Sequence, residues 1–198
     1  MTIILASGNR HKKAEIVRIL PSHTILLPEE NGISFDYEET GETFLENAMG
    51  KALHLHELTG EPALADDSGL CVPALDGAPG VFSARYGSEE KGEGLTDSDR
   101  NEYLLENMRD VTDRRAFFVC SMVLVVNENR FYAAQETFHG EITLSPQGAG
   151  GFGYDPLFFL PALGKTAAQL TSDQKNEISH RGKAVTAIAG LIESAEIE

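Results

Sequence analysis

Hydrophobic positions along the chain follow two spacings, one typical of buried strands and one typical of helices. Residues 3–6 and 117–126 are almost continuously apolar, and runs of this kind predict strands buried on both faces. Residues 43–58 show the helical spacing instead. The apolar stripe there consists of Phe44, Ala48, Ala52 and Leu55.

The start of this helix carries a signal of its own. Thr43 followed by Glu46 three residues later is a capping box, which satisfies backbone N–H groups at a helix start. A second helix is predicted ahead of it, ending before Pro21 because proline cannot continue a helix. Its apolar positions are Ala14, Val17 and Leu20.

The remaining elements are read from turn residues and shorter patterns. We expect two short strands at 62–65 and 70–72 around a polar turn, Asp66-Asp67-Ser68-Gly69. In chain order there follow a Gly/Pro loop over 74–86, a helix over 97–108, a hairpin of 115–126 and 130–143, a Gly-rich loop over 148–153 and a last helix over 179–195. Strands occur both with intervening helices and as a hairpin, which favours a mixed α/β sheet in a single domain over 1–198.

Composition narrows the class of protein and its partners. The chain has 198 residues, 41% hydrophobic and 24% charged, as in a soluble globular protein. Its formal net charge of -15 argues against duplex nucleic acid or an anionic membrane as a partner, because both are bound through clustered cations. We expect a cytoplasmic protein, because the apolar run that ends before Ser7 is too short to be the apolar region of a signal peptide. Cys71 and Cys120 lie in apolar stretches and are expected to be buried free thiols.

The order of the charges adds a hypothesis. Residues 10–18 and 165–183 are rich in cations, whereas 29–46 and 61–76 carry carboxylates and no cation. Acidic segments that hold a divalent metal, beside basic segments that hold phosphate, would form a metal–polyphosphate site. A well-mixed solvated surface explains the same pattern.

Two familiar motifs fail on their context. Residues 148–153 spell G-x-G-x-x-G, but Pro156 follows closely and disfavours the helix N-terminus that a dinucleotide site needs. Gly164-Lys165-Thr166 resembles the end of a phosphate-binding loop, but Phe159 stands where its leading glycine belongs.

Four segments keep a chemical interpretation beside a structural one. Ser7-Gly8-Asn9 with Lys12 is either an anion site at a helix N-terminus or a simple cap. Asp66-Asp67 is either a carboxylate pair neutralised by Mg²⁺ or a surface turn. Phe152 among glycines either stacks on a base or fills a core. Ser179-His180-Arg181, with Lys175 a turn earlier, either contacts ligand oxygens or caps the last helix.

Together these segments resemble the inosine triphosphate pyrophosphatase (ITPase, Ham-like) family, whose bacterial members remove deaminated purine nucleotides. The resemblance runs from residue 5 to 184. Its pieces are Leu5 to Asn9 with Lys12, Glu38 to Gly41, Phe44 to Ala48, Ala65 to Leu70, Gly77 to Val81, Ser83 to Tyr86, Gly150 to Pro156 and Ile178 to Ala184. Residues 87–114 match nothing distinctive.

The resemblance implies a two-lobed α/β fold with an elongated mixed sheet and the nucleotide in a cleft between the lobes. It also implies a homodimer, a Mg²⁺ requirement, and the hydrolysis of ITP, dITP or XTP to the monophosphate and pyrophosphate.

Residue roles follow from the same resemblance. Glu39 and Asp67 would hold Mg²⁺, and Asp67 would accept a proton, bind the metal, or both. Phe152 would stack on the base, while His180, Arg181 and the backbone near Asp155 would recognise its 6-oxo group. The expected substrate-binding set, with the phosphate contacts first, is Ser7, Gly8, Asn9, Lys12, Lys51, Lys175, Ser68, Phe152, Gly153, Tyr154, Asp155, His180 and Arg181.

Two alternatives remain beside this reading. One is a related pyrophosphatase acting on other modified or pyrimidine nucleotides, and the other is a catalytically silent nucleotide-binding protein. The complete segments at Phe152 and Ser179 argue against the first, and the presence of Glu39 and Asp67 argues against the second.

Overall fold

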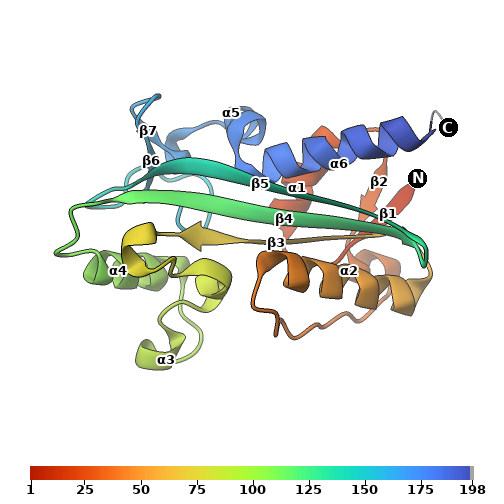
Figure 1. Ribbon diagram of the computed structural model, residues 1–198, viewed down its shortest axis with the longest axis horizontal. Helices are drawn as coiled ribbons and strands as arrows, with labels where there is room; N and C mark the ends of the chain where they lie inside the picture. Colours follow the sequence, from red (N-terminus) through yellow and green to blue (C-terminus); the bar gives the residue numbers. More distant parts are fainter. Residues whose placement is uncertain (197–198) are drawn as a thin grey trace. The chain divides into compact units, whose positions relative to one another are not determined.

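The computed structural model describes residues 1–196 as a mixed α/β protein built on a seven-stranded sheet (Figure 1). The sheet order is β2-β1-β3-β4-β5-β6-β7. In chain order the strands and helices are β1 (Thr2–Leu5), α1 (Arg10–Ile19), β2 (Thr24–Leu26), α2 (Phe44–Thr59), β3 (Ala63–Cys71), α3 (Ser88–Lys91), α4 (Asp97–Asn107), β4 (Arg115–Asn127), β5 (Arg130–Ile142), β6 (Phe158–Leu160), β7 (Lys165–Thr166), α5 (Ser172–Ile178) and α6 (His180–Glu196).

The sheet is mixed, as the sequence predicts. β1 pairs in parallel with β2 and β3, whereas β6 pairs antiparallel with β5 and β7. The contacts divide the chain into two compact units, in agreement with the two-lobed expectation. Unit 1 comprises 1–68, 120–136 and the described part of 176–198; unit 2 comprises 69–119 and 137–175.

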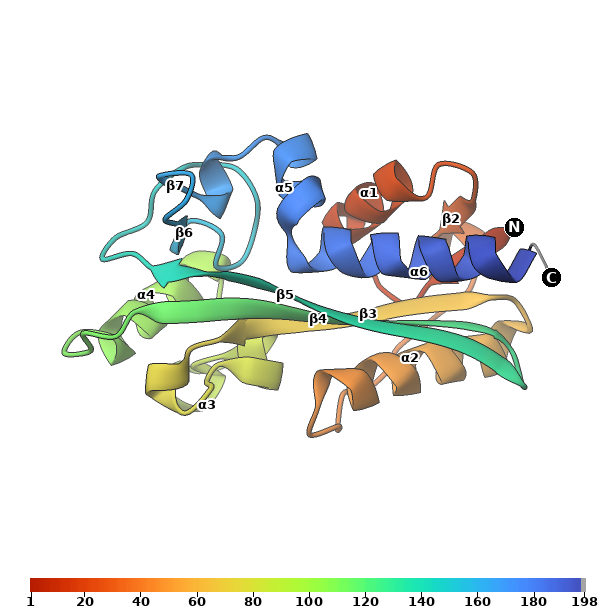
Figure 2. The ribbon, with the colours of Figure 1, turned by 45° about the horizontal axis from the view of Figure 1, so that its top comes forward.

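In unit 1 the sheet is covered on both faces, which explains why its strands are apolar throughout. Helices α1 and α6 lie on one face and α2 on the other (Figure 2). Successive strand side chains alternate between them: Ile3 and Leu5 pack toward α1 and α6, whereas Ile4 and Ala6 pack toward α2.

Several predicted elements are confirmed. Helix α2 begins after Thr43 with the capping box to Glu46, and it buries Ala48, Ala52 and Leu55. Helix α4, the β4–β5 hairpin and the C-terminal helix also lie where the sequence places them. Strands β2, β6 and β7 and helices α3 and α5 are short and were not predicted.

Three expectations are wrong. Residues 66–69 form no turn: β3 runs unbroken from Ala63 to Cys71, because both aspartates find partners within the fold. In α1 the predicted stripe is wrong in part: Leu20 is buried as expected, but Ala14 and Val17 are exposed and Ile16 is buried instead. Cys71 is only partly buried, and of the two thiols only Cys120 is enclosed.

Candidate active site

The carboxylates of β3 are the centre of the candidate site in unit 1. Asp66 and Asp67 are adjacent in a strand, so their side chains point to opposite faces of the sheet. Asp66 faces the side that carries α1 and α6, and Asp67 faces α2. Two neighbouring residues of one type therefore lie in different surroundings.

Asp66 is the anchor of a buried ion-pair network. Its Oδ2 lies 3.0 Å from Lys12 Nζ and 3.2 Å from Arg181 Nε, with Ser68 Oγ donating at 3.2 Å. Arg181 also donates to Ser68 Oγ at 2.8 Å and to Glu15 Oε2 at 2.6 Å. Burial raises the pKa of Asp66, but the charges of Lys12 and Arg181 outweigh burial and hold it far below its ordinary value.

Asp67 has milder partners. Asn47 Nδ2 donates to its Oδ2 at 3.0 Å, and Lys51 Nζ lies 3.8 Å from its Oδ1. Burial and the nearby charge of Glu39 raise the pKa of Asp67, although Lys51 and Asn47 oppose them. A carboxylate with a raised pKa is the better proton acceptor.

Lys51 joins Asp67 to Glu39. Its ammonium bonds Glu39 Oε1 at 2.5 Å and the carbonyl oxygen of Asp66 at 2.8 Å. Burial lowers the pKa of Lys51, but the surrounding carboxylates outweigh it and raise the pKa above its ordinary value. The Glu39 and Asp67 carboxylates thus converge on one cation.

The residues expected to bind Mg²⁺ fit that ion. The two carboxylates share one bound cation, Lys51, and the charge of Glu39 helps to raise the pKa of Asp67. Mg²⁺ is commonly held by one or two carboxylates, with substrate phosphates and water completing its coordination. Within residues 1–196 there is no group of three or more acidic, histidine or cysteine side chains that could hold a metal ion.

The segment between β1 and α1 is a capped helix start. Asn9 Oδ1 accepts the N–H groups of His11 and Lys12, at 2.9 and 3.3 Å, and Ser7 Oγ accepts that of Asn9 at 3.0 Å. Gly8 has open space where a Cβ would stand. The turn brings Lys12 onto Asp66, which the sequence did not indicate.

The start of α6 is formed by Ser179, His180 and Arg181, all buried. Ser179 caps the helix, with its Oγ accepting the N–H of Gly182 at 3.1 Å. Gly182 approaches the preceding helix so closely that a Cβ would stand 1.7 Å from the carbonyl oxygen of Asn176. The capping interpretation is confirmed for Ser179, and a role of His180 and Arg181 toward a base stays a prediction.

In unit 2 the Gly-rich loop carries the second set of expected residues. Asp155 is buried, and its Oδ2 accepts the N–H of Phe152 at 2.9 Å and the Lys175 ammonium at 2.6 Å. Lys175 Nζ also lies 4.6 Å from the centre of the Phe152 ring. Tyr154 is buried, with its hydroxyl donating to the carbonyl oxygen of Ser83 at 2.8 Å. The structure therefore places the Lys175 ammonium beside the Phe152 ring.

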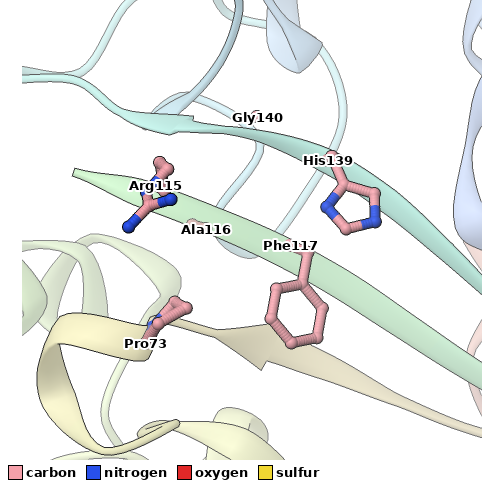
Figure 3. Close-up of a pocket in the computed structure, with 6 residues that line it drawn as sticks. All are labelled: Pro73, Arg115, Ala116, Phe117, His139 and Gly140. Carbon is pink, nitrogen blue, oxygen red and sulfur yellow. The ribbon is translucent and has the colours of Figure 1, made fainter. Parts of the chain in front are cut away.

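A cavity of about 390 Å³ in unit 2 lies away from the expected residues (Figure 3). Its lining consists of Pro73, Arg115, Ala116, Phe117, His139 and Gly140, none of which the sequence singled out. Phe117 and His139 face each other across the β4–β5 pair with ring centres 5.5 Å apart.

Sequence reasoning missed two side chains that organise the site in unit 1. Asn47 donates to Asp67 and accepts the N–H of Gly41, which ties the segment carrying Glu39 to β3. Its position one helical turn before Lys51 was the available signal. Glu15 binds Arg181 at a separation of 166 residues, for which the sequence holds no local signal.

The fold, the residues around Asp67 in unit 1 and the residues around Phe152 in unit 2 define a class of protein. It is an α/β enzyme with paired carboxylates beside buried lysines, suited to a metal–polyphosphate substrate. Comparison with known proteins identifies the family. Residues 3–191 match the Ham1 family, and the chain belongs to it.

Individual relatives cover the chain almost completely. It is 55% identical to the dITP/XTP pyrophosphatase of Treponema denticola over 98% of this chain and 100% of that one. It is 46% identical to the dITP/XTP pyrophosphatase of Nitrosomonas europaea, covering 98% and 95%. Among solved structures, a HAM1 protein from Coxiella burnetii superposes with a TM-score of 0.89 at 42% identity, covering 98% of this chain and 99% of that one.

Proposed function

We propose that this protein hydrolyses deaminated purine nucleoside triphosphates (ITP, dITP and XTP) to the monophosphate and pyrophosphate, and so cleanses the nucleotide pool. The observation that carries the proposal is the convergence of Glu39 and Asp67 on Lys51. Relatives named dITP/XTP pyrophosphatase, at 55% and 46% identity, support the choice of substrate.

The proposed reaction breaks the bond between the α- and β-phosphates. Water adds to the α-phosphorus, the monophosphate retains the new oxygen, and pyrophosphate leaves. Asp67 would orient that water and accept its proton, a role that its raised pKa favours. Asn47 fixes the direction of the carboxylate.

Cations of unit 1 would bind the triphosphate. Lys12 and Lys51 present ammonium groups, and Ser7 and Asn9 add neutral donors. Mg²⁺, held by Glu39 and Asp67, would offset negative charge as the anhydride breaks. Phe152 would stack on the base, with Lys175 beside its ring and Asp155 binding the Lys175 ammonium.

Discrimination against ATP would depend on donors facing the base. Inosine and xanthosine present an oxygen at C6, whereas adenosine presents an amino group. Donors from His180, Arg181 or nearby backbone would bond the oxygen and leave an amino group unsatisfied, and a site of this kind rejects the mismatch by roughly 10⁴-fold. Arg181→Ala should then lower kcat/KM for ITP far more than for ATP. An equal loss of kcat/KM for both substrates, with a lower melting temperature, would show that Arg181 acts only through its ion pairs with Asp66 and Glu15.

The experiment that tests the function is pyrophosphate release from ITP, dITP, XTP, GTP, ATP and pyrimidine triphosphates, with Mg²⁺ and with a chelator. We expect turnover of the deaminated purines in Mg²⁺ and loss of it with the chelator. Equal turnover of ATP and ITP would contradict the specificity, and undiminished turnover with the chelator would contradict the metal requirement.

We further propose that the protein acts in the cytoplasm as a homodimer. No helix within residues 1–196 is long and apolar enough to cross a membrane. Ultracentrifugation of the purified protein should give twice the 21.5 kDa of one chain. A single species at the monomer mass would contradict the dimer.

A further inference from the structure

Residues 87–114, which resemble nothing distinctive in sequence, supply the side chains that hold the Gly-rich loop. Two of them, Asp97 and Asn101, lie one turn apart on helix α4. Asp97 Oδ2 accepts the N–H of Gly153 at 2.7 Å, and Asn101 Nδ2 donates to the carbonyl oxygen of Gly153 at 3.1 Å. Both backbone groups of one loop residue are therefore bound by one helix.

Gly153 is the residue where the loop most needs support. Its φ of +60° lies in the left-handed region, and a Cβ there would meet nothing within 4 Å. Packing around the α-carbon therefore does not fix this conformation. The two bonds from α4 each hold one of the peptide planes that flank Gly153, and the first plane is also held from within the loop, where the Phe152 carbonyl oxygen accepts the N–H of Asp155 at 3.2 Å.

These bonds bear directly on Phe152. The N–H of Phe152 is bound to Asp155, and the next N–H along the chain, that of Gly153, is bound to Asp97. The peptide before Phe152 is thus held from within the loop, and the peptide after it is held both from the loop, by the N–H of Asp155, and from α4. An aromatic ring whose backbone is held before a ligand arrives loses less entropy on binding.

The burial of Asn101 indicates that its hydrogen bond to Gly153 is kept at a cost in the stability of the fold. The residue is 5% exposed, and within residues 1–196 its Oδ1 has no hydrogen-bond partner. An unsatisfied buried acceptor destabilises a protein, so an apolar residue of the same shape would serve the core of unit 2 as well or better. What only asparagine supplies here is the donor to Gly153.

We propose that Asp97 and Asn101 are positioning residues, which act as a clamp on Gly153 and orient the Phe152 ring for the nucleotide base. This inference rests on the proposed function of Phe152. The clamp would add to nucleotide affinity in the ground state and the transition state alike, so its loss should raise KM and leave kcat nearly unchanged.

The decisive variant is Asn101→Leu, which removes the donor and the unsatisfied acceptor together. We expect KM for ITP to rise about tenfold, the factor for one lost hydrogen bond, with kcat within about twofold. The melting temperature should change little, because the Gly153 carbonyl oxygen that loses its donor belongs to a residue that is only partly buried and can bond water instead. A purely structural role predicts the reverse, a lower melting temperature with an unchanged KM.

At position 97 one substitution removes the acceptor for the Gly153 N–H and another retains it. Asp97→Ala removes the acceptor for the Gly153 N–H and should raise KM, whereas Asp97→Asn keeps an oxygen acceptor and should restore most of the affinity. The matched control is Asp99→Ala, which removes from the same turn of α4 a carboxylate that accepts the backbone N–H and the hydroxyl of Thr96 and, within residues 1–196, makes no hydrogen bond to the Gly-rich loop. If Asp99→Ala raises KM as much as Asp97→Ala, helix stability is the cause and the proposal fails.

A direct measurement of the ring separates this inference from the proposed function. The chain contains no tryptophan, so Phe152→Trp introduces a single fluorescent reporter. Adding Asn101→Leu to that variant should lower the fluorescence anisotropy of the indole in the free protein, and adding Asp99→Ala should not. Unchanged anisotropy with Asn101→Leu would overturn the clamp. If ITP leaves the indole emission of the parent variant unchanged, the base-binding role of Phe152 fails, while the anisotropy comparison still decides whether α4 orders the loop.

Discussion

Asp66 and Asp67 are neighbours with the same side chain, and the fold gives them opposite surroundings. Asp66 is surrounded by Lys12 and Arg181, which depress its pKa, whereas Asp67 lies near Glu39 and has a raised pKa. The cause is the alternation of side chains along β3, which turns one carboxylate toward α1 and α6 and the other toward α2.

From this comparison we infer a structural role for Asp66 and, under the proposed function, a reactive role for Asp67. A carboxylate locked between two cations is a poor proton acceptor, because protonating it would forfeit both ion pairs. Asp67 accepts two neutral N–H groups, those of Asn47 and of the Ser68 backbone, and has one more distant ammonium, so it has less to lose. We therefore expect substitutions of Asp67 to affect turnover and substitutions of Asp66 to affect stability.

The largest effect is expected from Asp67→Asn. The change removes the charge at nearly constant volume, so the fold should persist while kcat falls by at least about 10²-fold, the low end for a lost general base. Pyrophosphate release from ITP measures kcat, and circular dichroism checks the fold. A variant that keeps a tenth of wild-type kcat would show that Asp67 has no essential part in the reaction.

Asp66→Asn should show the opposite profile. It leaves Arg181 and Lys12 without their shared counter-ion in a buried place, and breaking a buried ion pair in this way costs about 3–5 kcal/mol. Denaturant unfolding measures the loss, with the exposed Asp110→Asn as the matched control. Equal stabilities of Asp66→Asn and Asp110→Asn would remove Asp66 from its anchoring role.

How far the sequence predicts this arrangement depends on the range of each interaction. The capping box of Thr43 and Glu46 spans three residues and was predicted correctly, because both partners stand in one local pattern. The unbroken β3 was missed, because Asp-Asp-Ser-Gly favours a turn locally and only the fold supplies the opposing cations. Arg181 reaches Asp66 across 115 residues, a pairing that no local rule contains.

The candidate site likewise contains residues that local motifs indicate and contacts that they do not. The residue types at Glu39, Asp67, Lys51 and Phe152 were available from motifs, but the sequence does not show that Lys51 bonds Glu39 or that Lys175 lies at the Phe152 ring. Glycines in a loop allow its backbone to approach a ligand closely. At Gly150 the structure gives another reason, since a Cβ would stand 2.9 Å from the carbonyl oxygen of Ala168.

Lys12→Ala tests the comparison by removing one of the two cations that surround Asp66. If Lys12 also bonds the triphosphate, its loss should weaken substrate binding by about 1.5–3 kcal/mol, the value for a bond to a charged group. The KM for ITP measures this, and unfolding of the free protein measures the lost pair with Asp66. Unchanged KM and kcat together with lower stability would assign Lys12 to the Asp66 network alone.

The smallest effect is expected from Ser68→Ala, which tests the network without changing its charge. Ser68 Oγ donates to Asp66 Oδ2 and accepts from Arg181, so it joins the two ions through one hydroxyl. Removing it should cost about 1 kcal/mol, since the ions still bond each other directly. Combined with Asp66→Asn in a double-mutant cycle, the two losses should not add, because the hydroxyl stabilises a pair that the second change abolishes. Additive losses would show that Ser68 acts independently of Asp66, and the network would then reduce to the ion pairs of Asp66 with Lys12 and Arg181.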